Sequence, residues 1–166
     1  IISSRDRAAQ AFRVTRDAFQ VQAGVHANLG KLEAWSPRGG DCPPGLPPAA
    51  WKGNKSEHEN GLKILGIPLG QPAYINAILA DRIEKEKELL DHLPQLPDLQ
   101  CAWSILIYCA VPRANYLMRS IPPLLCSTYA TNHDQALLDC FANLLHLGRP
   151  LHADDRTAQQ CALPLK

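Results

Sequence analysis

Two places in the sequence carry residue types suited to phosphate or metal chemistry. Asp154 and Asp155 are adjacent carboxylates, the ligands that bind Mg²⁺ in nucleotidyl-transfer enzymes. They follow His152 in a polar C-terminal segment with no strand or hairpin around it, which favours a solvated acidic tail. Lys31 could pair with a phosphate or donate a proton to it. On spacing alone, a surface lysine is the favoured interpretation.

The six cysteines show no CxxC pair and no zinc-finger spacing with histidine. Cys101, Cys109 and Cys140 lie inside apolar helical patterns, so we expect buried free thiols in a reducing compartment. A zinc site built from His133, Cys140 and His146 is the less favoured alternative. The sequence therefore predicts no metal site.

The composition is that of a folded chain, with 46% hydrophobic and 20% charged residues. A net charge of +1 lacks the strong basic excess of a free-standing nucleic-acid-binding protein. The longest apolar run, Cys101 to Pro112, is shorter than the ~20 residues of a membrane span. No signal peptide is recognisable near Ile1. We expect an intracellular protein, cytoplasmic or nuclear, with no membrane partner.

The first part of the chain has mixed character. An apolar stripe predicts a helix over Arg5–Gln22, ended by Gly24. Val25–Trp35 is predicted to be extended with a turn within it. Ser36–Gly53 is rich in proline and glycine and is predicted to be a loop. Leu62–Ile67 is predicted to be a short strand that turns near Pro68, because proline is excluded from central strands.

The second part is predicted to be helical. Pro72 suits the first position of a helix that Pro94 ends, and its run Asp81–Glu88 is predicted to face solvent. Asp81–Lys85 and Arg82–Glu86 are spaced as ion pairs on that face. Further helices are predicted over about Asp98–Val111, over Arg113–Arg119, and over Pro122–Leu147 with a possible interruption at Asn132 or Asp134. The sequence thus predicts an α+β fold, mostly α, in which a small mixed front precedes a helical bundle; the family resemblance described below makes the short strand part of a β-hairpin. Its parts would be residues 1–70, 71–148 and a polar tail at 149–166.

Two motifs, taken in order, resemble a known family. The first is Gly24, Asn28 and Lys31, and the second is the LG-centred pattern Ile64–Leu69. Together they are similar to the region downstream of the catalytic aspartate box in reverse transcriptases of non-LTR retrotransposons. Stretches around Trp103, Arg113 and His133 also look like this family, so the resemblance runs from about Phe12 to Leu147.

The resemblance implies roles for particular residues. Lys31 would lie near the incoming nucleotide's phosphates at the end of the palm. Lys63, Leu65 and Gly66 would belong to the primer-grip hairpin. The helices that follow would form a thumb, with Arg113 and Arg119 contacting a template–primer duplex of RNA and DNA. Lys52 and Lys55 are further candidate contacts to its phosphates.

The chain also departs from the family pattern. The metal-binding aspartates of the family lie upstream of the Gly–Asn–Lys pattern, where this sequence has only Asp6 and Asp17. Leu32 stands where the family usually has threonine. We therefore expect a fragment or degenerate copy that binds template–primer together with the rest of a parent polyprotein. Alone it would be inactive, and Mg²⁺ is expected only in an intact parent enzyme. The alternative is a helical protein-interaction module without nucleic-acid function.

Overall fold

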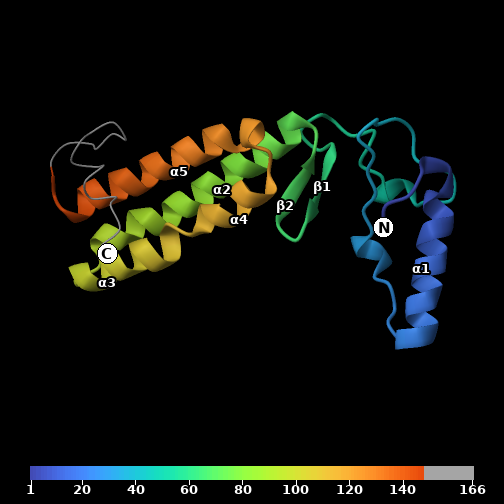
Figure 1. The fold of residues 1–166 in the computed structure, drawn as a ribbon, viewed down its shortest axis with the longest axis horizontal. Coiled ribbons are helices and arrows are strands. Elements are labelled where there is room, and N and C mark those ends of the chain that lie inside the picture. The colour runs from blue at the N-terminus through green and yellow to red at the C-terminus, as the bar shows by residue number, and fades with distance from the viewer. Residues whose placement is uncertain (148–166) are drawn as a thin grey trace. The chain divides into compact units, whose positions relative to one another are not determined.

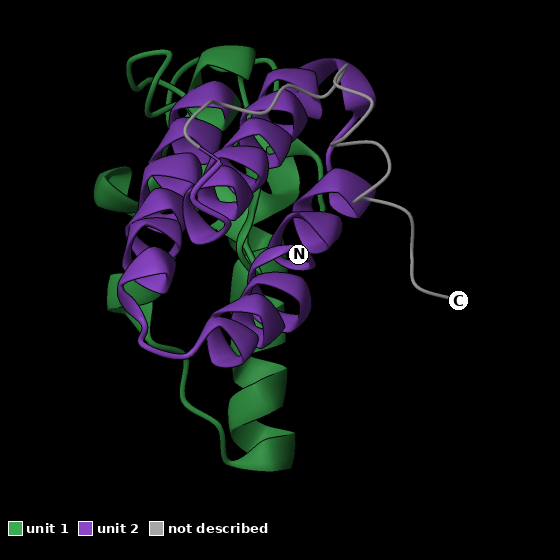
Figure 2. Cartoon of the chain, turned by 90° about the vertical axis from the view of Figure 1, so that its left-hand side faces the viewer, with its two compact units in different colours: residues 1–75 green, residues 76–166 purple. Residues whose placement is uncertain are grey.

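The fold of the chain is α+β and mostly α, as predicted. The structure, a computed structural model, describes residues 1–147 and divides into two compact units, residues 1–75 and residues 76 onward (Figure 2). The main elements (Figure 1) are α1 (Ala8–Ala23), β1 (Gly61–Ile64), β2 (Ile67–Gly70), α2 (Pro72–His92), α3 (Leu99–Ile105), α4 (Arg113–Ser120) and α5 (Pro123–Leu144).

The first helix ends where the sequence predicts. A 3-10 turn at Arg5–Arg7 leads into α1, and Gly24 terminates the helix in the left-handed conformation with a φ of 64°. A glycine is favoured there because a Cβ is strained at positive φ.

The segment predicted to be extended before the proline-rich loop is only partly so. Leu29–Lys31 forms a 3-10 turn, and beyond it Ala34 makes a parallel bridge to Trp51. The amide of Ala34 donates to the carbonyl of Ala50 at 2.8 Å, and the amide of Lys52 donates to Ala34 at 2.9 Å. The bridge fastens the end of the loop to the chain that precedes it. The Trp51 side chain is buried, and its Nε1 donates to the carbonyl of Gly40 at 2.7 Å.

The predicted single strand Leu62–Ile67 is wrong in its extent, because the chain reverses within it. β1 and β2 pair antiparallel, and Leu65 and Gly66 form the connection with φ angles of 51° and 87°. Two positive φ values are typical of the type I′ turn, whose twist matches that of the strands. Pro68 lies inside β2, opposite Lys63. It is tolerated because both strands of a two-stranded sheet are edge strands.

α2 begins with Pro72 as predicted, at the end of the first unit, and continues into the second with one buried stripe along its length. The buried residues recur every three or four positions, which is the helical period: Ile75, Leu79, Ile83, Glu86, Leu90 and, just beyond the helix, Leu93. α5 is uninterrupted from Pro123 to Leu144, so the possible interruption at Asn132 or Asp134 does not occur.

The predicted helix Asp98–Val111 consists of two parts. Asp98 caps α3, because its Oδ1 accepts from the amides of Gln100 at 2.7 Å and Cys101 at 3.2 Å. The hydrogen bond from Cys101, followed by that from Gln100, lowers the pKa of the Asp98 carboxyl. After α3 the chain widens into a π-helical segment, Leu106–Ala110, in which the amide of Val111 donates to Leu106 at 3.0 Å. π-Helical turns are rare and are often found at functional sites.

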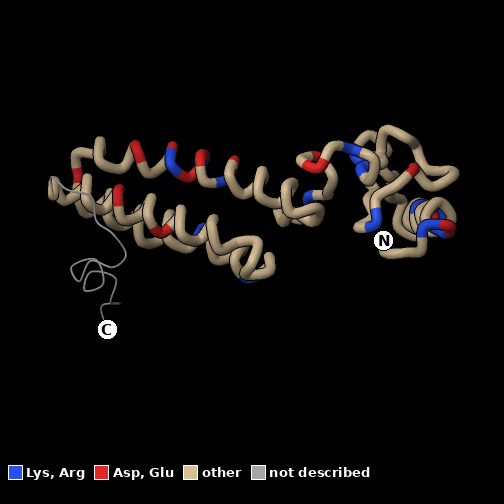
Figure 3. Tube along the Cα trace, turned by 90° about the horizontal axis from the view of Figure 1, so that it is seen from above, with Lys and Arg blue, Asp and Glu red and all other residues tan. Residues whose placement is uncertain are grey.

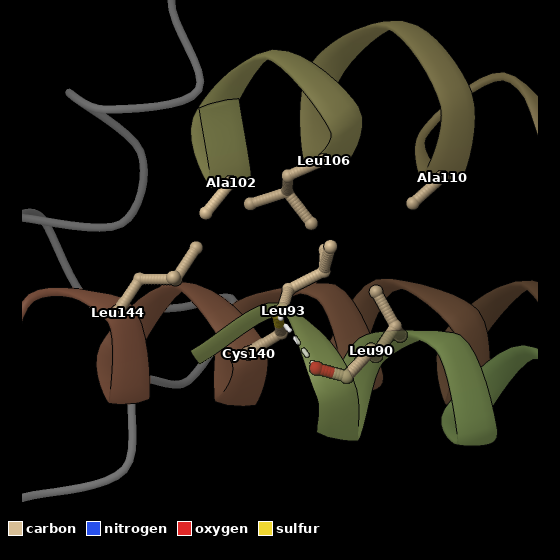
Figure 4. Close-up of a cluster of buried hydrophobic side chains, with 7 residues drawn as sticks. All are labelled: Leu90, Leu93, Ala102, Leu106, Ala110, Cys140 and Leu144. Atoms are coloured by element: carbon tan, nitrogen blue, oxygen red, sulfur yellow. Dashed lines mark hydrogen bonds between the residues drawn. The ribbon is translucent and has the colours of Figure 1, made fainter. Parts of the chain in front are cut away.

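One apolar cluster joins the far end of α2 to α3 and α5 (Figure 4). Leu93 lies between side chains of the α3–π segment, Leu106 among them, and side chains of α5 such as Cys140. Burying a leucine of this kind contributes about 1.5–3 kcal/mol. The cysteine prediction is correct for Cys140 but wrong for Cys101 and Cys109, which are exposed because the buried face of this segment carries Ala102, Leu106 and Ala110 instead.

No helix in the part of the chain that the structure describes has both the length and the apolar character to span a membrane.

Candidate functional site

The hairpin tip is an exposed apolar loop with one lysine beside it. Leu65 is 87% exposed, and Ile64 before it is 48% exposed. Lys63 is also exposed, on β1. A non-glycine residue at positive φ costs of order 1–3 kcal/mol, and such residues occur preferentially at functional positions. The structure therefore brings together the predicted residues Lys63, Leu65 and Gly66.

The other predicted contacts lie elsewhere. Lys31 ends the 3-10 turn that Asn28 caps, its Oδ1 accepting from the amide of Gly30 at 3.1 Å. Lys31 is exposed and has no ion pair among residues 1–147. Arg113 and Arg119 are exposed near the two ends of α4, in the second unit. Asp154 and Asp155 lie outside the described residues.

The first unit also contains a polar hollow that sequence reasoning did not identify. Its volume is about 260 Å³, and it is lined by Glu33, Lys52, Lys55, His58, Glu59, Gly61 and Tyr74. The bridge between Ala34 and Trp51 places Glu33 beside Lys52, whose Nζ lies 3.4 Å from the Glu33 carboxylate. We refer to these seven residues as the polar hollow.

Asn60 ties together the segments that surround the polar hollow. Its side-chain oxygen accepts from Trp35 Nε1 at 2.6 Å, and its amide nitrogen donates to the carbonyl of Gly53 at 3.4 Å. Its backbone carbonyl accepts from the amide of Gln71 at 3.0 Å. The side chain of Asn60 thus joins the segment before the loop to the loop itself, and its backbone carbonyl adds the entry to α2.

The floor of the polar hollow requires a glycine. A Cβ on Gly61 would lie 2.3 Å from Cδ1 of Tyr74, so the aromatic ring rests directly on the backbone of β1. Burial, and next the negative charge of Glu33, raise the pKa of the Tyr74 phenol. The phenol therefore stays protonated at neutral pH and is available as an O–H donor.

The second unit contains a closed polar cluster around Glu86, a residue predicted to face solvent. That prediction is wrong for Glu86, which is only 3% exposed. Tyr129 donates to Glu86 Oε1 at 2.9 Å, and His133 Nδ1 lies 2.9 Å from Oε2. The expected pair with Arg82 is present at 3.4 Å, and Asp81–Lys85 is present at 2.6 Å. We refer to Glu86, Tyr129 and His133 as the buried network.

The surroundings of the buried network favour the charged forms of both Glu86 and His133. Burial alone would lower the pKa of His133, but its hydrogen bond and charge interaction with Glu86 raise that pKa overall. His133 Nε2 also lies 3.4 Å from the carbonyl of Val111, so a protonated imidazolium can donate from both nitrogens. Burial opposes ionisation of Glu86 as well, yet the hydrogen bonds from His133 and Tyr129 lower its pKa.

The spacing of the sequence contained a signal for this network. Glu86 falls three residues after Ile83 and four before Leu90, within the apolar stripe of α2. Tyr129 and His133 are four apart on the buried face of α5. A charged residue at such a position is seldom buried without a partner, so the stripe could have suggested a pairing.

The chain shows no cation site suited to Mg²⁺ in its described part. No group of three or more His, Cys, Asp and Glu side chains among residues 1–147 could hold a metal ion. His133 of the alternative zinc site is engaged with Glu86 instead.

No family model, curated protein or solved structure matches the chain.

Proposed function

We propose that this chain contributes template–primer binding to RNA-directed DNA synthesis, as the palm end and thumb of a reverse-transcriptase-like protein. The observation that supports this proposal is the hairpin of β1 and β2, which has an exposed tip at Leu65–Gly66 and leads directly into a helical unit. The resemblance implies this order of elements. The metal-binding aspartates would come from the rest of a parent polyprotein.

The contacts that carry the proposal are few and local. Lys63 on β1 and Lys31 in its 3-10 turn are exposed cations free to neutralise backbone phosphates. Leu65 presents an apolar side chain that can pack on a sugar or a base. Arg113 and Arg119 would add phosphate contacts from α4. Binding of this kind is independent of sequence and weakens with salt, because each neutralised phosphate releases a counterion.

The test is fluorescence anisotropy of a labelled RNA–DNA primer–template duplex with the full chain, at salt concentrations from about 50 to 200 mM. We expect affinity to fall steeply with salt, and Lys63→Gln to reduce the slope of log K against log salt by about 1. Lys85→Gln is the matched control, since Lys85 is paired with Asp81 on α2. An absence of binding at low salt would contradict the proposal, and so would nucleotide incorporation by the chain alone.

A helical protein-interaction module is the second candidate, and exposed apolar side chains favour it. They occur along α3, the π-helical segment and α4, where Trp103 is 37% and Tyr108 78% exposed. Acidic and basic residues are interspersed along α2 (Figure 3), so α2 presents no continuous basic strip of the kind that a duplex prefers. Exposed aromatic residues are common anchors in protein interfaces.

The two candidates are separated by one substitution. Ile107→Asp places a charge among the exposed apolar side chains and should abolish association with a protein partner or a second copy, measured by sedimentation velocity. If duplex binding is unchanged and association is lost, the helical unit is an interaction module. If duplex affinity falls as well, the π-helical segment that carries Ile107 belongs to the nucleic-acid surface.

A further inference from the structure

The polar hollow contains more donors than its own acceptors use. Glu33 is paired with Lys52, and Glu59 accepts from Ser56 Oγ at 3.3 Å. Lys55 and His58 have no hydrogen-bond or ion-pair partner through their side chains among residues 1–147. The protonated phenol of Tyr74 also lines the hollow. Three side-chain donors therefore border one space, and two of them can carry positive charge.

The turn that carries Lys55 and His58 is fixed at both ends. The amide of Lys55 donates to the carbonyl of Lys52 at 3.3 Å, and the amide of Glu59 donates to Ser56 at 2.8 Å. Asn60 then anchors the turn to Gly53 and Trp35. A ligand would consequently meet a backbone that is already ordered, which lowers the entropic cost of binding.

We propose that the polar hollow binds the terminal phosphate of a phosphomonoester, held by Lys55, His58 and Tyr74. A phosphomonoester carries a charge of about −1.5 to −2 and three terminal oxygens, one for each of these donors. An internal phosphodiester has a single charge and two free oxygens. It also brings further phosphates towards Glu33 and Glu59, which would repel them.

The size of the hollow limits the ligand to this group and its immediate attachment. Pockets for whole drug-sized ligands measure about 300–1,000 Å³, whereas this one measures about 260 Å³ and is open to solvent. The phosphate could belong to a nucleic-acid end or to a small free molecule. Both sources share the same chemistry, and the experiment separates them. Lys55 was also predicted to contact the duplex, but duplex binding is proposed to rest on Lys31, Lys63, Arg113 and Arg119, so this proposal goes beyond it.

The experiment measures binding of the full chain to three probes at matched ionic strength. These are inorganic phosphate, a single-stranded oligonucleotide with a 5′-phosphate, and the same oligonucleotide without it. We expect the phosphorylated oligonucleotide to bind about tenfold tighter than the unphosphorylated one. This is about the gain in affinity that one hydrogen bond to a charged group provides. Inorganic phosphate should shift the ring resonances of His58, assigned by comparison with His58→Gln.

Variants test the assignment of the donors. Lys55→Gln and His58→Gln should each abolish the preference for the 5′-phosphate. Tyr74→Phe should weaken it while keeping the ring over Gly61, and Lys85→Gln should leave it unchanged. Circular dichroism checks that each variant is folded. Lys55 and His58 are exposed, so neither substitution removes a buried side chain from the fold.

Each outcome is decisive. A preference for the phosphorylated oligonucleotide supports a nucleic-acid end as the source. A response to inorganic phosphate without that preference supports a small phosphorylated molecule. Equal binding of both oligonucleotides together with no response to inorganic phosphate overturns the proposal. Salt-dependent duplex binding in that last case would leave the proposed function standing, so the two failures are distinguishable.

Discussion

The polar hollow of the first unit and the buried network of the second use similar side chains to opposite effect. Each combines a histidine, a tyrosine and glutamate. In the buried network every polar group has a partner, and Glu86 and His133 are each 3% exposed. In the polar hollow, Lys55 and His58 are exposed and their side chains have no partner in the described chain. A satisfied cluster stabilises the fold, whereas unsatisfied donors around an open space can bind a ligand.

The largest effect should come from removing the carboxylate of the buried network. Glu86→Ala leaves His133 and Tyr129 buried without their acceptor, and we expect a loss of about 3–5 kcal/mol in the free energy of unfolding. Urea denaturation followed by circular dichroism measures it. Glu88→Gln, two residues along the same helix but exposed, is the matched control and should change stability by no more than about 0.5 kcal/mol. Equal effects at both positions would show that Glu86 is not buried.

A matched pair of tyrosine substitutions sharpens the comparison. Tyr129→Phe removes a buried hydrogen bond to a charged group and should cost about 1.5–3 kcal/mol of unfolding free energy. Tyr74→Phe should leave stability nearly unchanged and reduce phosphate binding instead. Thermal and urea unfolding of the two variants provides the measurement. If Tyr74→Phe lost more stability than Tyr129→Phe, the hydrogen bonds of the buried network would not be the ones that stabilise the fold.

The buried network should also make stability depend on pH. The pKa of Glu86 is lowered from its ordinary value of 4.5, so its contribution is complete above that value and is lost as pH falls through the folded-state pKa. The pKa of His133 is raised from 6.5, so its contribution is complete below 6.5 and is lost as pH rises through its folded-state pKa. Arg82, Arg113 and Asp134 also act on these groups.

The lowered pKa of Glu86 and the raised pKa of His133 together predict that the free energy of unfolding is greatest between about pH 4.5 and 6.5 and declines on both sides. Urea midpoints measured from pH 4 to 9 test this. His133→Gln should flatten the alkaline decline, and Lys85→Gln should leave it in place. An alkaline decline that persists in His133→Gln would assign it to another group.

The smallest effect is expected at the hairpin tip, and its sign is opposite. Leu65→Asn relieves the strain of a leucine at a φ of 51°, because asparagine tolerates the left-handed conformation. We expect a gain of about 0.5–1 kcal/mol in the free energy of unfolding together with weaker duplex binding. Anisotropy and urea unfolding give the two quantities. A variant that gains stability and keeps its duplex affinity would exclude Leu65 from the nucleic-acid surface.

Local chemistry made several elements predictable from the sequence. Gly24 ended α1 and Pro72 began α2 as predicted, because these positions need the backbone conformation that glycine and proline provide. The helix predicted from about Asp98 starts one residue later, because Asp98 serves as its cap. The hairpin was misjudged in its extent because Pro68 was read as a strand breaker, although an edge strand accommodates it. Cys101 and Cys109 were wrongly predicted to be buried. The hydrophobicity of a helix does not by itself show which of its apolar side chains pack against another helix.

The sequence by itself determined the helical character of the chain, the boundaries that glycine, proline and capping residues impose, and the presence of a hairpin before the bundle. Only the tertiary structure decided which charged side chains are buried and which residues they contact. Glu86 falls in the apolar stripe of α2, but it is buried only because Tyr129 and His133, more than forty residues away, offset the cost of its desolvation. Glu33 and Tyr74 lie in the same hollow as Lys55 and His58 because Asn60 joins the segments that carry them. Such pairings depend on contacts between distant residues, which local spacing does not encode.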